Sequence, residues 1–431
     1  MYSRHVYFPF FVLTRLPKQS IYLYKHYCMF HREMPEQVLG NFPKAAESLF
    51  NRIGKKIRPD YSKPTTMRMP LYQKLCLLLF TLSALLQQVS TAQRADSILL
   101  KNYRPKSIYK IPVTKIENAK FPVIDVHSHS YAKSVADIEG WIALMDKYRI
   151  EKTLILSYAT GKKFDSVFNI YSKYKGRFDV WCGFDYSAIN EPGGVEKAVK
   201  ELERCFRMGA KGVGELGDKG FGEYYSYPVP SGMHVDDPRL KPLFQKCGEL
   251  KMPVNIHVAE PMWMYEPMDS TNDGLMNAYE WRIEKYKSKQ NLKGHPALIQ
   301  TLENVVRENP NTIFIACHYA NCEYDLSILG SLLNKYSNLY ADISARYAET
   351  SPIPRYMFNF FEKYQDKLLY GTDMGFYSEM YEMTFRILQT SDEHFYYHNI
   401  TGYHWPLHGF GLSDAVLKKV YKTNALKILK R

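Results

Sequence analysis

The chain has 431 residues, of which 45% are hydrophobic and 23% are charged, and its formal net charge is +13. This composition is that of a globular protein and excludes collagen-like, coiled-coil and wholly disordered chains. The positive charge is unevenly spread: residues 1–66 carry 11 basic and 4 acidic residues, whereas residues 93–431 carry 44 basic and 40 acidic ones. Because most of the basic excess lies before residue 93, we expect no nucleic-acid partner.

A short apolar run near the N-terminus has the features of an export signal. Two basic residues precede the apolar stretch 75–86, and the small residues at 90–92 follow it. A run of this length is too short to cross a bilayer. The pattern predicts a signal peptide over 67–92, with cleavage near Ala92-Gln93 and export to the periplasm or the medium. A buried helix is the alternative interpretation.

The residues before this signal do not fit the usual arrangement, in which a signal peptide begins a chain. We interpret residues 1–66 as translated sequence that the native protein lacks, with Met67 or Met69 as its start, and we expect little structure there. Residues 93–120 then lead into a single catalytic domain at 121–431. No other stretch reaches 18 apolar residues, so we expect no membrane span.

Five of the seven cysteines fall after residue 93. Their number is odd and their spacing does not resemble a zinc knuckle, and a chain of this length has its own hydrophobic core. We expect them to be buried thiols, although a bridge between Cys317 and Cys322 stays open. The five are Cys182, Cys205, Cys247, Cys317 and Cys322.

Eight short apolar or β-branched runs follow residue 120, separated by segments of helical length such as 195–208 and 297–308. The runs are 121–126, 153–157, 179–184, 212–216, 253–258, 312–317, 339–343 and 367–370. Strands that alternate with helices pair in parallel, and eight such units predict an α/β fold of the (β/α)8 TIM-barrel type. A doubly wound open sheet is the alternative. The first run is followed by His-Ser-His instead of a glycine-rich turn, which disfavours that alternative.

Side chains that bind metals stand where several of these strands end. They are His127 and His129 after the first strand, Glu215 at the fourth, His257 at the fifth, His318 at the sixth and Asp373 after the eighth. In a barrel of parallel strands these ends meet at one mouth. Imidazoles and carboxylates bind zinc and similar divalent ions, and the spacing of two residues puts His127 and His129 on one side of a strand. The pattern predicts a divalent-metal site, with zinc as the expected ion.

Six segments resemble, in order, the amidohydrolase superfamily, and most of all its amidohydrolase-related (amidohydrolase 2) branch. The segments are FPVIDVHSHSY, KGVGELGDKG, PVNIHVAEP, IFIACHYAN, LLYGTDMG and LSDAVLKKVYKTNALKIL. The resemblance runs from about Phe121 to the C-terminus. It implies that His127, His129, His257 and Asp373 bind the metal and leave a position for water. Asp373 would also be the general base.

The resemblance leaves some roles open. His318 would polarise the substrate carbonyl or be a ligand in a two-metal site. Glu215 would bridge a second ion or face the substrate, and we expect one ion. Asp125 would support His127 or belong to the barrel floor.

Fewer residues of the sequence indicate how a substrate would be bound. Arg346 would hold a substrate carboxylate or form a structural ion pair. Trp263 and Tyr265 would form an apolar wall of the pocket or belong to the core. The long region 374–412 is expected to be a lid with its own helix.

These features predict a secreted, metal-dependent hydrolase that acts on an amide, ester or lactone of a small molecule. The first alternative is a metal-dependent decarboxylase of a small unsaturated or aromatic acid. The second is a barrel that binds a metal or ligand without catalysis. The sequence leaves open whether the chain forms homo-oligomers.

Overall fold

The computed structural model describes residues 95–225, 232–283 and 292–429. The predicted extension (1–66) and signal peptide (67–92) lie outside the described residues. Within the described ranges, none of the helices combines the length and the apolar character that crossing a bilayer requires.

Eight parallel strands form the centre of the domain. They are β1 (Val123–Ser128), β2 (Ile150–Leu156), β3 (Phe178–Trp181), β4 (Val213–Asp218), β5 (Val254–Val258), β6 (Phe314–Ala316), β7 (Leu339–Asp342) and β8 (Leu368–Leu369). They pair in sequence order as one sheet of β1 to β3 and one of β4 to β8. Each overlaps one of the predicted strands, so the α/β interpretation is confirmed.

Backbone hydrogen bonds connect the two sheets on both sides. After β3, the Cys182 amide donates to the Gly212 carbonyl over 3.0 Å, and the Gly214 amide of β4 donates to the Cys182 carbonyl over 2.8 Å. On the other side, the Val126 amide of β1 donates to the carbonyl of Tyr370 over 2.9 Å. This connectivity is that of the predicted (β/α)8 barrel.

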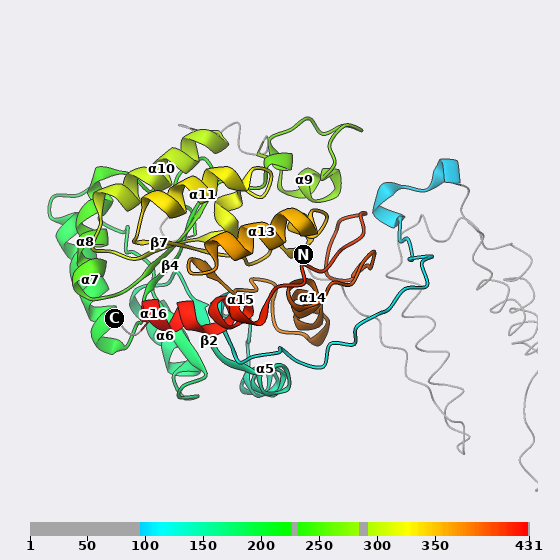
Figure 1. The fold of residues 1–431 in the computed structure, drawn as a ribbon. Helices are drawn as coiled ribbons and strands as arrows, with labels where there is room; N and C mark the ends of the chain where they lie inside the picture. Colours follow the sequence, from blue (N-terminus) through cyan, green and yellow to red (C-terminus); the bar gives the residue numbers. More distant parts are fainter. Residues whose placement is uncertain (1–94, 226–231, 284–291, 430–431) are drawn as a thin grey trace, which may run out of the picture. The chain divides into compact units, whose positions relative to one another are not determined.

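Helices follow the strands and lie around them (Figure 1). The longer ones are α5 (Val135–Tyr148), α6 (Gly161–Tyr171), α7 (Gly194–Met208), α8 (Lys241–Glu249), α10 (His295–Glu308), α11 (Leu326–Lys335), α13 (Pro354–Tyr364) and α14 (Ser378–Gln389). Short elements are η1 (Ala95–Ser97), η2 (Leu100–Asn102), η3 (Pro238–Leu240), η4 (Met262–Met264), α9 (Leu275–Trp281), η6 (Cys317–Asn321), α12 (Tyr347–Thr350), α15 (Asp414–Lys418), η7 (Lys419–Thr423) and α16 (Asn424–Leu429).

The helix α7 shows why these segments fold as they do. Its buried residues Ala198, Leu202 and Cys205 recur every three or four positions, which gives one apolar side toward the core. The helix ends at Gly209, whose φ of 125° is a conformation that glycine adopts without steric strain. All five cysteines after residue 93 are buried and free, so Cys317 and Cys322 form no bridge.

The region predicted as a lid contains α14, which follows β8 as the eighth helix of the barrel. Eight of its twelve residues are buried, so α14 belongs to the packed layer of helices. The following segment folds back on itself, with an antiparallel bridge between Phe395 and Leu407. It brings the stretch 400–403 to the cavity described below.

Candidate metal centre

The structure brings all six predicted metal-site residues together at the carboxyl ends of the strands. His127 lies in β1 and His129 directly after it, Glu215 lies in β4 and His257 in β5, His318 lies in η6 after β6, and Asp373 follows β8. Every one of the four imidazoles has a ring nitrogen within 4.0 Å of a carboxylate oxygen of Glu215 or Asp373. The barrel thus gathers residues that are up to 246 positions apart in the sequence.

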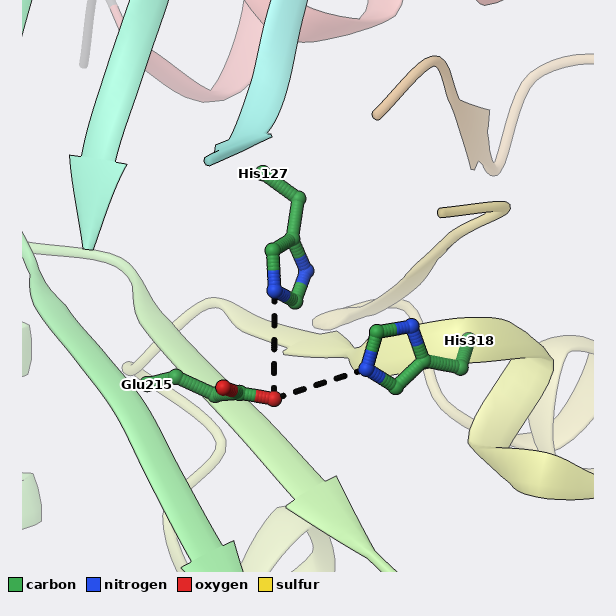
Figure 2. Close-up of side chains that lie close together, drawn as sticks. All are labelled: His127, Glu215 and His318. Atoms are coloured by element: carbon green, nitrogen blue, oxygen red, sulfur yellow. Dashed lines mark ion pairs between the residues drawn. The ribbon is translucent and has the colours of Figure 1, made fainter. Parts of the chain in front are cut away.

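Glu215 lies between the imidazoles, and Figure 2 shows the rings of His127 and His318 pointing toward its carboxylate. Its Oε1 is 2.8 Å from His257 Nδ1, 3.5 Å from His318 Nε2 and 3.8 Å from His127 Nε2. Its Oε2 is 3.5 Å from His129 Nε2. A carboxylate in contact with four imidazoles is placed as a ligand would be, and it is buried together with His127, His257 and His318.

Asp373 closes the opposite side of this cluster. Its Oδ1 is 3.1 Å from His129 Nε2 and accepts a hydrogen bond of 3.0 Å from the Tyr131 hydroxyl. Its Oδ2 is 3.7 Å from His318 Nε2. The Asp373 side chain is 21% exposed whereas that of His127 is 0% exposed, so Asp373 is the carboxylate that meets solvent and ligands.

Hydrogen bonds behind the rings fix which nitrogen faces the centre. His129 Nδ1 donates to the carbonyl of Leu156 over 2.8 Å, and His318 Nδ1 donates to the carbonyl of Ser344 over 2.8 Å. Because a carbonyl oxygen only accepts, both Nδ1 atoms carry a proton and each Nε2 presents its lone pair inward when the ring is neutral. His257 is reversed, since its Nε2 donates to the Ala259 carbonyl over 2.9 Å and its Nδ1 faces Glu215.

The charges of the site act strongly on one another. Burial by itself lowers the pKa of His127, but the carboxylates of Asp342 and Asp373 raise it to about 10. Burial would raise the pKa of Asp373, yet the neighbouring imidazoles of His127 and His129 hold it below its usual range. The pKa of Glu215 is likewise held well below its usual range by His257 and His318, against the effect of burial. The carboxylates therefore stay ionised, and the centre attracts positive charge.

The residues present fit a divalent cation. His127 Nε2 is buried and has no hydrogen-bond partner among the described residues. A lone pair in this state is costly unless a proton or a metal ion occupies it. His127 belongs to three sets of three ligand atoms, and within each set the atoms lie within 4.8 Å of one another. Its partners are Glu215 and His318 in one set, His129 and Asp373 in another, and Cys317 and Asp342 in the third. Imidazole nitrogens and carboxylate oxygens are the ligand types of zinc and similar ions.

The position of His318 depends on an unusual backbone conformation. His318, Tyr319 and Ala320 have φ values of 57°, 54° and 57°. This left-handed conformation costs conformational energy in residues other than glycine. Contacts with neighbouring strands hold it: the His318 amide donates to Asp342 Oδ1 over 3.0 Å, and the Asn321 side chain donates to the Val258 carbonyl over 2.9 Å. This turn ends β6 at Ala316, one residue before the predicted end of the strand.

Asp125 and Gly371 join the two strands that carry His127 and Asp373. The Asp125 carboxylate is fully buried and accepts bonds of 3.0 Å and 2.7 Å from the amide and hydroxyl of Thr372. A Cβ at Gly371 would lie only 2.8 Å from the Cβ of His127, so glycine permits this close approach. Asp125 therefore supports the site by holding the chain next to Asp373.

A cavity of about 400 Å³ opens beside the cluster. His129, Glu215, His257, His318 and Asp373 line it, together with Arg346. The lining includes Met264, whereas its neighbours Trp263 and Tyr265 pack with Ala278 and Ile283 in a small apolar cluster. The structure thus brings Arg346 to the metal-binding residues and places the two aromatic side chains behind the cavity wall.

Several site residues were missed by the sequence reasoning. Asp342 and Ser344 contact His127 behind the ring, and Lys219 and Glu260 line the cavity. Asp342 ends β7, Lys219 directly follows β4, and Glu260 follows β5 by two residues. The rule that selected the metal ligands, polar residues at the carboxyl ends of strands, would have found these three as well.

The sequence profile of the amidohydrolase family matches residues 185–431, which is more than half of the chain. Among curated proteins, none matches the chain. Solved structures that it resembles include 2,6-dihydroxybenzoate decarboxylase from Rhizobium, at 15% identity over 72% of this chain and 98% of that one, with a TM-score of 0.44. Dihydroxybenzoic acid decarboxylase from Polaromonas sp. JS666, solved with bound manganese, is 14% identical over 72% and 97%, with a TM-score of 0.45. The 4-oxalomesaconate hydratase from Rhodopseudomonas palustris is 13% identical over 72% of this chain and 95% of that one, with a TM-score of 0.42. The match to the family profile over more than half of its residues shows that the chain belongs to the amidohydrolase family.

Proposed function

We propose that this protein is a metal-dependent hydrolase that adds water to the carbonyl of an amide, ester or lactone in a small molecule. The observation that carries the proposal is the buried Nε2 of His127, which has no hydrogen-bond partner in the described part of the chain and faces two ionised carboxylates. The cavity beside it has room for a small molecule.

In this proposal the metal is held by His127, His129, His257 and Asp373, as the family resemblance implies. We add Glu215, because its carboxylate lies within 3.8 Å of all four imidazoles. Zinc is the expected ion, and one ion shared by the cluster is the expected number. If a second ion is bound, Glu215 would be the residue to contact both ions, because its Oε1 faces His257 and its Oε2 faces His129.

A bound divalent cation supplies a water of lowered pKa and a Lewis acid for the carbonyl oxygen. The chain itself supplies the base. Asp373 Oδ1 is engaged by His129 and Tyr131, so its Oδ2 is the freer oxygen to accept the proton of the attacking water and to return it to the leaving group. The 21% exposure of the side chain gives it access to that water.

If a second ion is bound, His318 takes the role of one of its ligands. Burial lowers the pKa of His318, so the ring is neutral near pH 7, and its proton is on the Nδ1 that donates to Ser344. The inward Nε2 is then an acceptor, which suits a metal. Polarising a carbonyl would require a proton on that nitrogen, and the lowered pKa opposes it.

Decarboxylation of a small unsaturated acid is the second candidate. It is favoured by one observation, which is that Lys219 and Arg346 place two cationic side chains in the cavity wall. The two reactions differ in their products, since decarboxylation releases carbon dioxide and hydrolysis consumes water and yields an acid. Assaying both products on one panel of esters, lactones, amides and unsaturated acids separates them.

The test of the proposed function combines metal analysis with turnover. The full chain is expected to hold about one zinc or similar ion, and His127→Ala is expected to lose it, whereas the control His394→Ala keeps it. Asp373→Asn with metal retained should abolish hydrolysis of the panel. A protein without metal after reconstitution would contradict the proposal and leave a binding barrel. Unchanged turnover in metal-loaded Asp373→Asn would instead contradict the assignment of Asp373 as the base.

We also propose that the protein is exported after cleavage near Ala92-Gln93. The support is the pattern of basic, apolar and small residues over 67–92. N-terminal sequencing of natively made protein is expected to begin near Gln93. A sequence that begins near Met1 would contradict both the export signal and the interpretation of residues 1–66.

A further inference from the structure

The segment that leads into the barrel concentrates exposed apolar side chains. We call residues 98–113 the arm, and they form the cyan segment before β1 in Figure 1. Elsewhere among the described residues, which include the whole barrel, nine large apolar side chains are exposed. The arm alone exposes eight, each between 36% and 84%: Ile98, Leu99, Leu100, Tyr103, Ile108, Tyr109, Ile111 and Val113. An apolar surface of this kind marks a site of interaction.

The arm is also the source of the net charge of residues 93–431. It contains four basic residues and no acidic one, and all four side chains are exposed: Lys101, Arg104, Lys106 and Lys110. Residues 93–431 carry 44 basic and 40 acidic residues, so without the arm that range holds 40 of each and is neutral. The positive charge of this part of the protein is therefore confined to 16 residues.

Partners within the protein do not balance this charge. In the described ranges none of the four basic groups forms an ion pair, whereas Lys115, just after the arm, pairs with Glu117 over 3.3 Å. Arg104 donates a hydrogen bond of 2.9 Å to the carbonyl of Tyr103, which is a neutral partner. The four charges are thus available to a partner outside the chain.

The arm is held against the domain at defined points. His398 Nε2 donates to the carbonyl of Pro105 over 2.7 Å, and the Ser107 hydroxyl lies 3.1 Å from His394 Nδ1. The ring of Tyr109 meets the ring of His394 edge-on at 4.8 Å. These contacts use the backbone, a hydroxyl and one ring, so the arm keeps its place while its aliphatic side chains stay exposed.

Apolar side chains that alternate with basic ones suit the surface of a bilayer with anionic lipid. In the arm the basic residues separate apolar groups at 98–100, 103, 108–109 and 111–113. Apolar side chains gain free energy at the boundary between headgroups and acyl chains, and Lys and Arg extend from there to lipid phosphates. Tyrosine is favoured at the same depth, because its ring is apolar and its hydroxyl is polar. One partner thus satisfies both features of the arm.

A second copy of this chain suits the arm less well. Two arms packed on each other would bring four basic residues from each copy together without an acidic partner, which is repulsive. An arm packed on the barrel of another copy would meet a domain whose charges balance, so its basic residues would gain little. The charge therefore favours a lipid surface.

We propose that the arm binds the protein peripherally to a bilayer that contains anionic lipid. The apolar side chains of the arm enter the headgroup region, and its four basic residues contact lipid phosphates. The attachment is reversible, because it rests on side chains at the interface and not on a helix across the bilayer. It does not depend on the reaction at the metal centre.

Co-sedimentation with vesicles of phosphatidylcholine, with and without phosphatidylglycerol, tests the charge of the arm. The protein is used in its natively processed form, with its N-terminus determined by mass spectrometry. We expect binding only with phosphatidylglycerol, and weaker binding at high salt, which screens the charges. Lys106→Gln/Lys110→Gln should weaken binding about 30-fold, since each basic residue contributes about fivefold near an anionic surface. Lys200→Gln/Lys211→Gln, which removes the same charge from exposed positions of the barrel, should bind as wild type does.

A second pair of variants tests the apolar side chains. Ile108 and Val113 are 84% and 72% exposed, so replacing them should not disturb the fold. We expect Ile108→Ser/Val113→Ser to weaken vesicle binding at least about tenfold. Val135→Ser/Ile170→Ser changes two exposed residues of α5 and α6 and is the matched control, with binding as in wild type. Circular dichroism checks that all variants are folded.

Lack of binding to phosphatidylglycerol vesicles at low salt would overturn the inference. Binding that neither arm variant weakens would overturn it as well, because another part of the protein would then hold the lipid. Sedimentation equilibrium without lipid tests the alternative partner. A dimer that dissociates in Ile108→Ser/Val113→Ser, in a protein that does not bind vesicles, would show that the arm joins two copies of the chain and would overturn the lipid proposal.

Discussion

Asp342 holds His127 from behind, with its Oδ2 2.9 Å from His127 Nδ1 and both side chains fully buried. The same carboxylate accepts the backbone amide of His318 over 3.0 Å through Oδ1. One residue of β7 thus contacts the ring of His127 in β1 and the backbone of His318 after β6. Burial opposes the ionised form, but His127 lowers the pKa of Asp342 to about 2, so Asp342 is charged and makes the ring a better ligand.

Replacing this carboxylate by its amide should therefore weaken the metal site. Asp342→Asn keeps the size of the side chain and an acceptor oxygen but removes the charge. We expect metal affinity to fall about 10- to 100-fold, because partners behind metal-binding histidines have effects of this size. Competition with a chelator measures the affinity, and circular dichroism checks the fold. Unchanged metal affinity in a folded variant would show that Asp342 has only a packing role.

A second prediction concerns the base. The Tyr131 hydroxyl donates to Asp373 Oδ1 over 3.0 Å and is part of the reason why Oδ2 is the freer oxygen. Tyr131→Phe removes this bond while keeping the ring against His129. We expect kcat to fall about ten- to hundredfold, the range of one hydrogen bond to a charged group, with metal content unchanged. Tyr158→Phe, which alters another tyrosine beside His129, is the matched control for kcat. Loss of metal in Tyr131→Phe would contradict the assignment.

The strand ends were predictable from sequence because a parallel barrel brings them to one mouth, whatever the loops between them do. His127, His129, Glu215, His257, His318 and Asp373 meet for this reason, although their positions span most of the domain. The orientation of each imidazole ring was not predictable in this way. That His257 faces Glu215 through Nδ1 depends on the Ala259 carbonyl, which accepts from His257 Nε2 and belongs to a residue with a φ of 64°.

The substrate side was less predictable because it depends on loops. Lys219, Glu260 and Arg346 come from the segments after β4, β5 and β7, and their pairing requires all three loop conformations. Sequence periodicity describes strands and helices and contains no information on such turns. The left-handed turn from His318 to Asn321 was not predictable from sequence either. Hydrogen bonds to other strands stabilise it, whereas its own residues do not favour that conformation.

A third prediction uses the buried Glu323. Neither of its carboxylate oxygens has a hydrogen-bond partner within the described ranges, and burial raises its pKa to about 7. Between pH 4.5, its ordinary pKa, and pH 7 the folded state binds more protons than the unfolded state, so stability falls as the pH rises. The contribution is at most about 3 kcal/mol and is constant above pH 7.

Glu323→Gln removes this titration. The free energy of unfolding of Glu323→Gln minus that of wild type should therefore be larger at pH 8 than at pH 5, by up to about 3 kcal/mol. Urea denaturation of both proteins at the two pH values measures the difference. Glu362→Gln changes a carboxylate on the outer helix α13 and should show no such dependence. The same difference between wild type and Glu323→Gln at both pH values would mean that Glu323 titrates normally.

The last prediction concerns the segment after α14, which forms one wall of the cavity. Asp392, at the start of this segment, accepts bonds from the amide and hydroxyl of Thr114 over 2.8 Å and 2.6 Å and from Arg386 Nε over 2.7 Å. Asp392 thereby ties the lead-in before β1 to the segment whose Tyr403 lines the cavity and donates to Glu349 over 3.0 Å. The carboxylate is 8% exposed, so water does not readily replace these partners.

Asp392→Asn should loosen this wall without removing the metal. The variant loses the charge that strengthens three hydrogen bonds, each worth about 1.5–3 kcal/mol when one partner is charged. We expect faster amide hydrogen exchange over 395–407, weaker binding of cavity ligands and an unchanged metal content. Thr114→Ser, which keeps the hydroxyl, is expected to exchange as wild type does, and Thr114→Val to exchange faster. Exchange that speeds up equally in the strands of the barrel would instead show that Asp392 stabilises the whole domain and does not act on the cavity wall in particular.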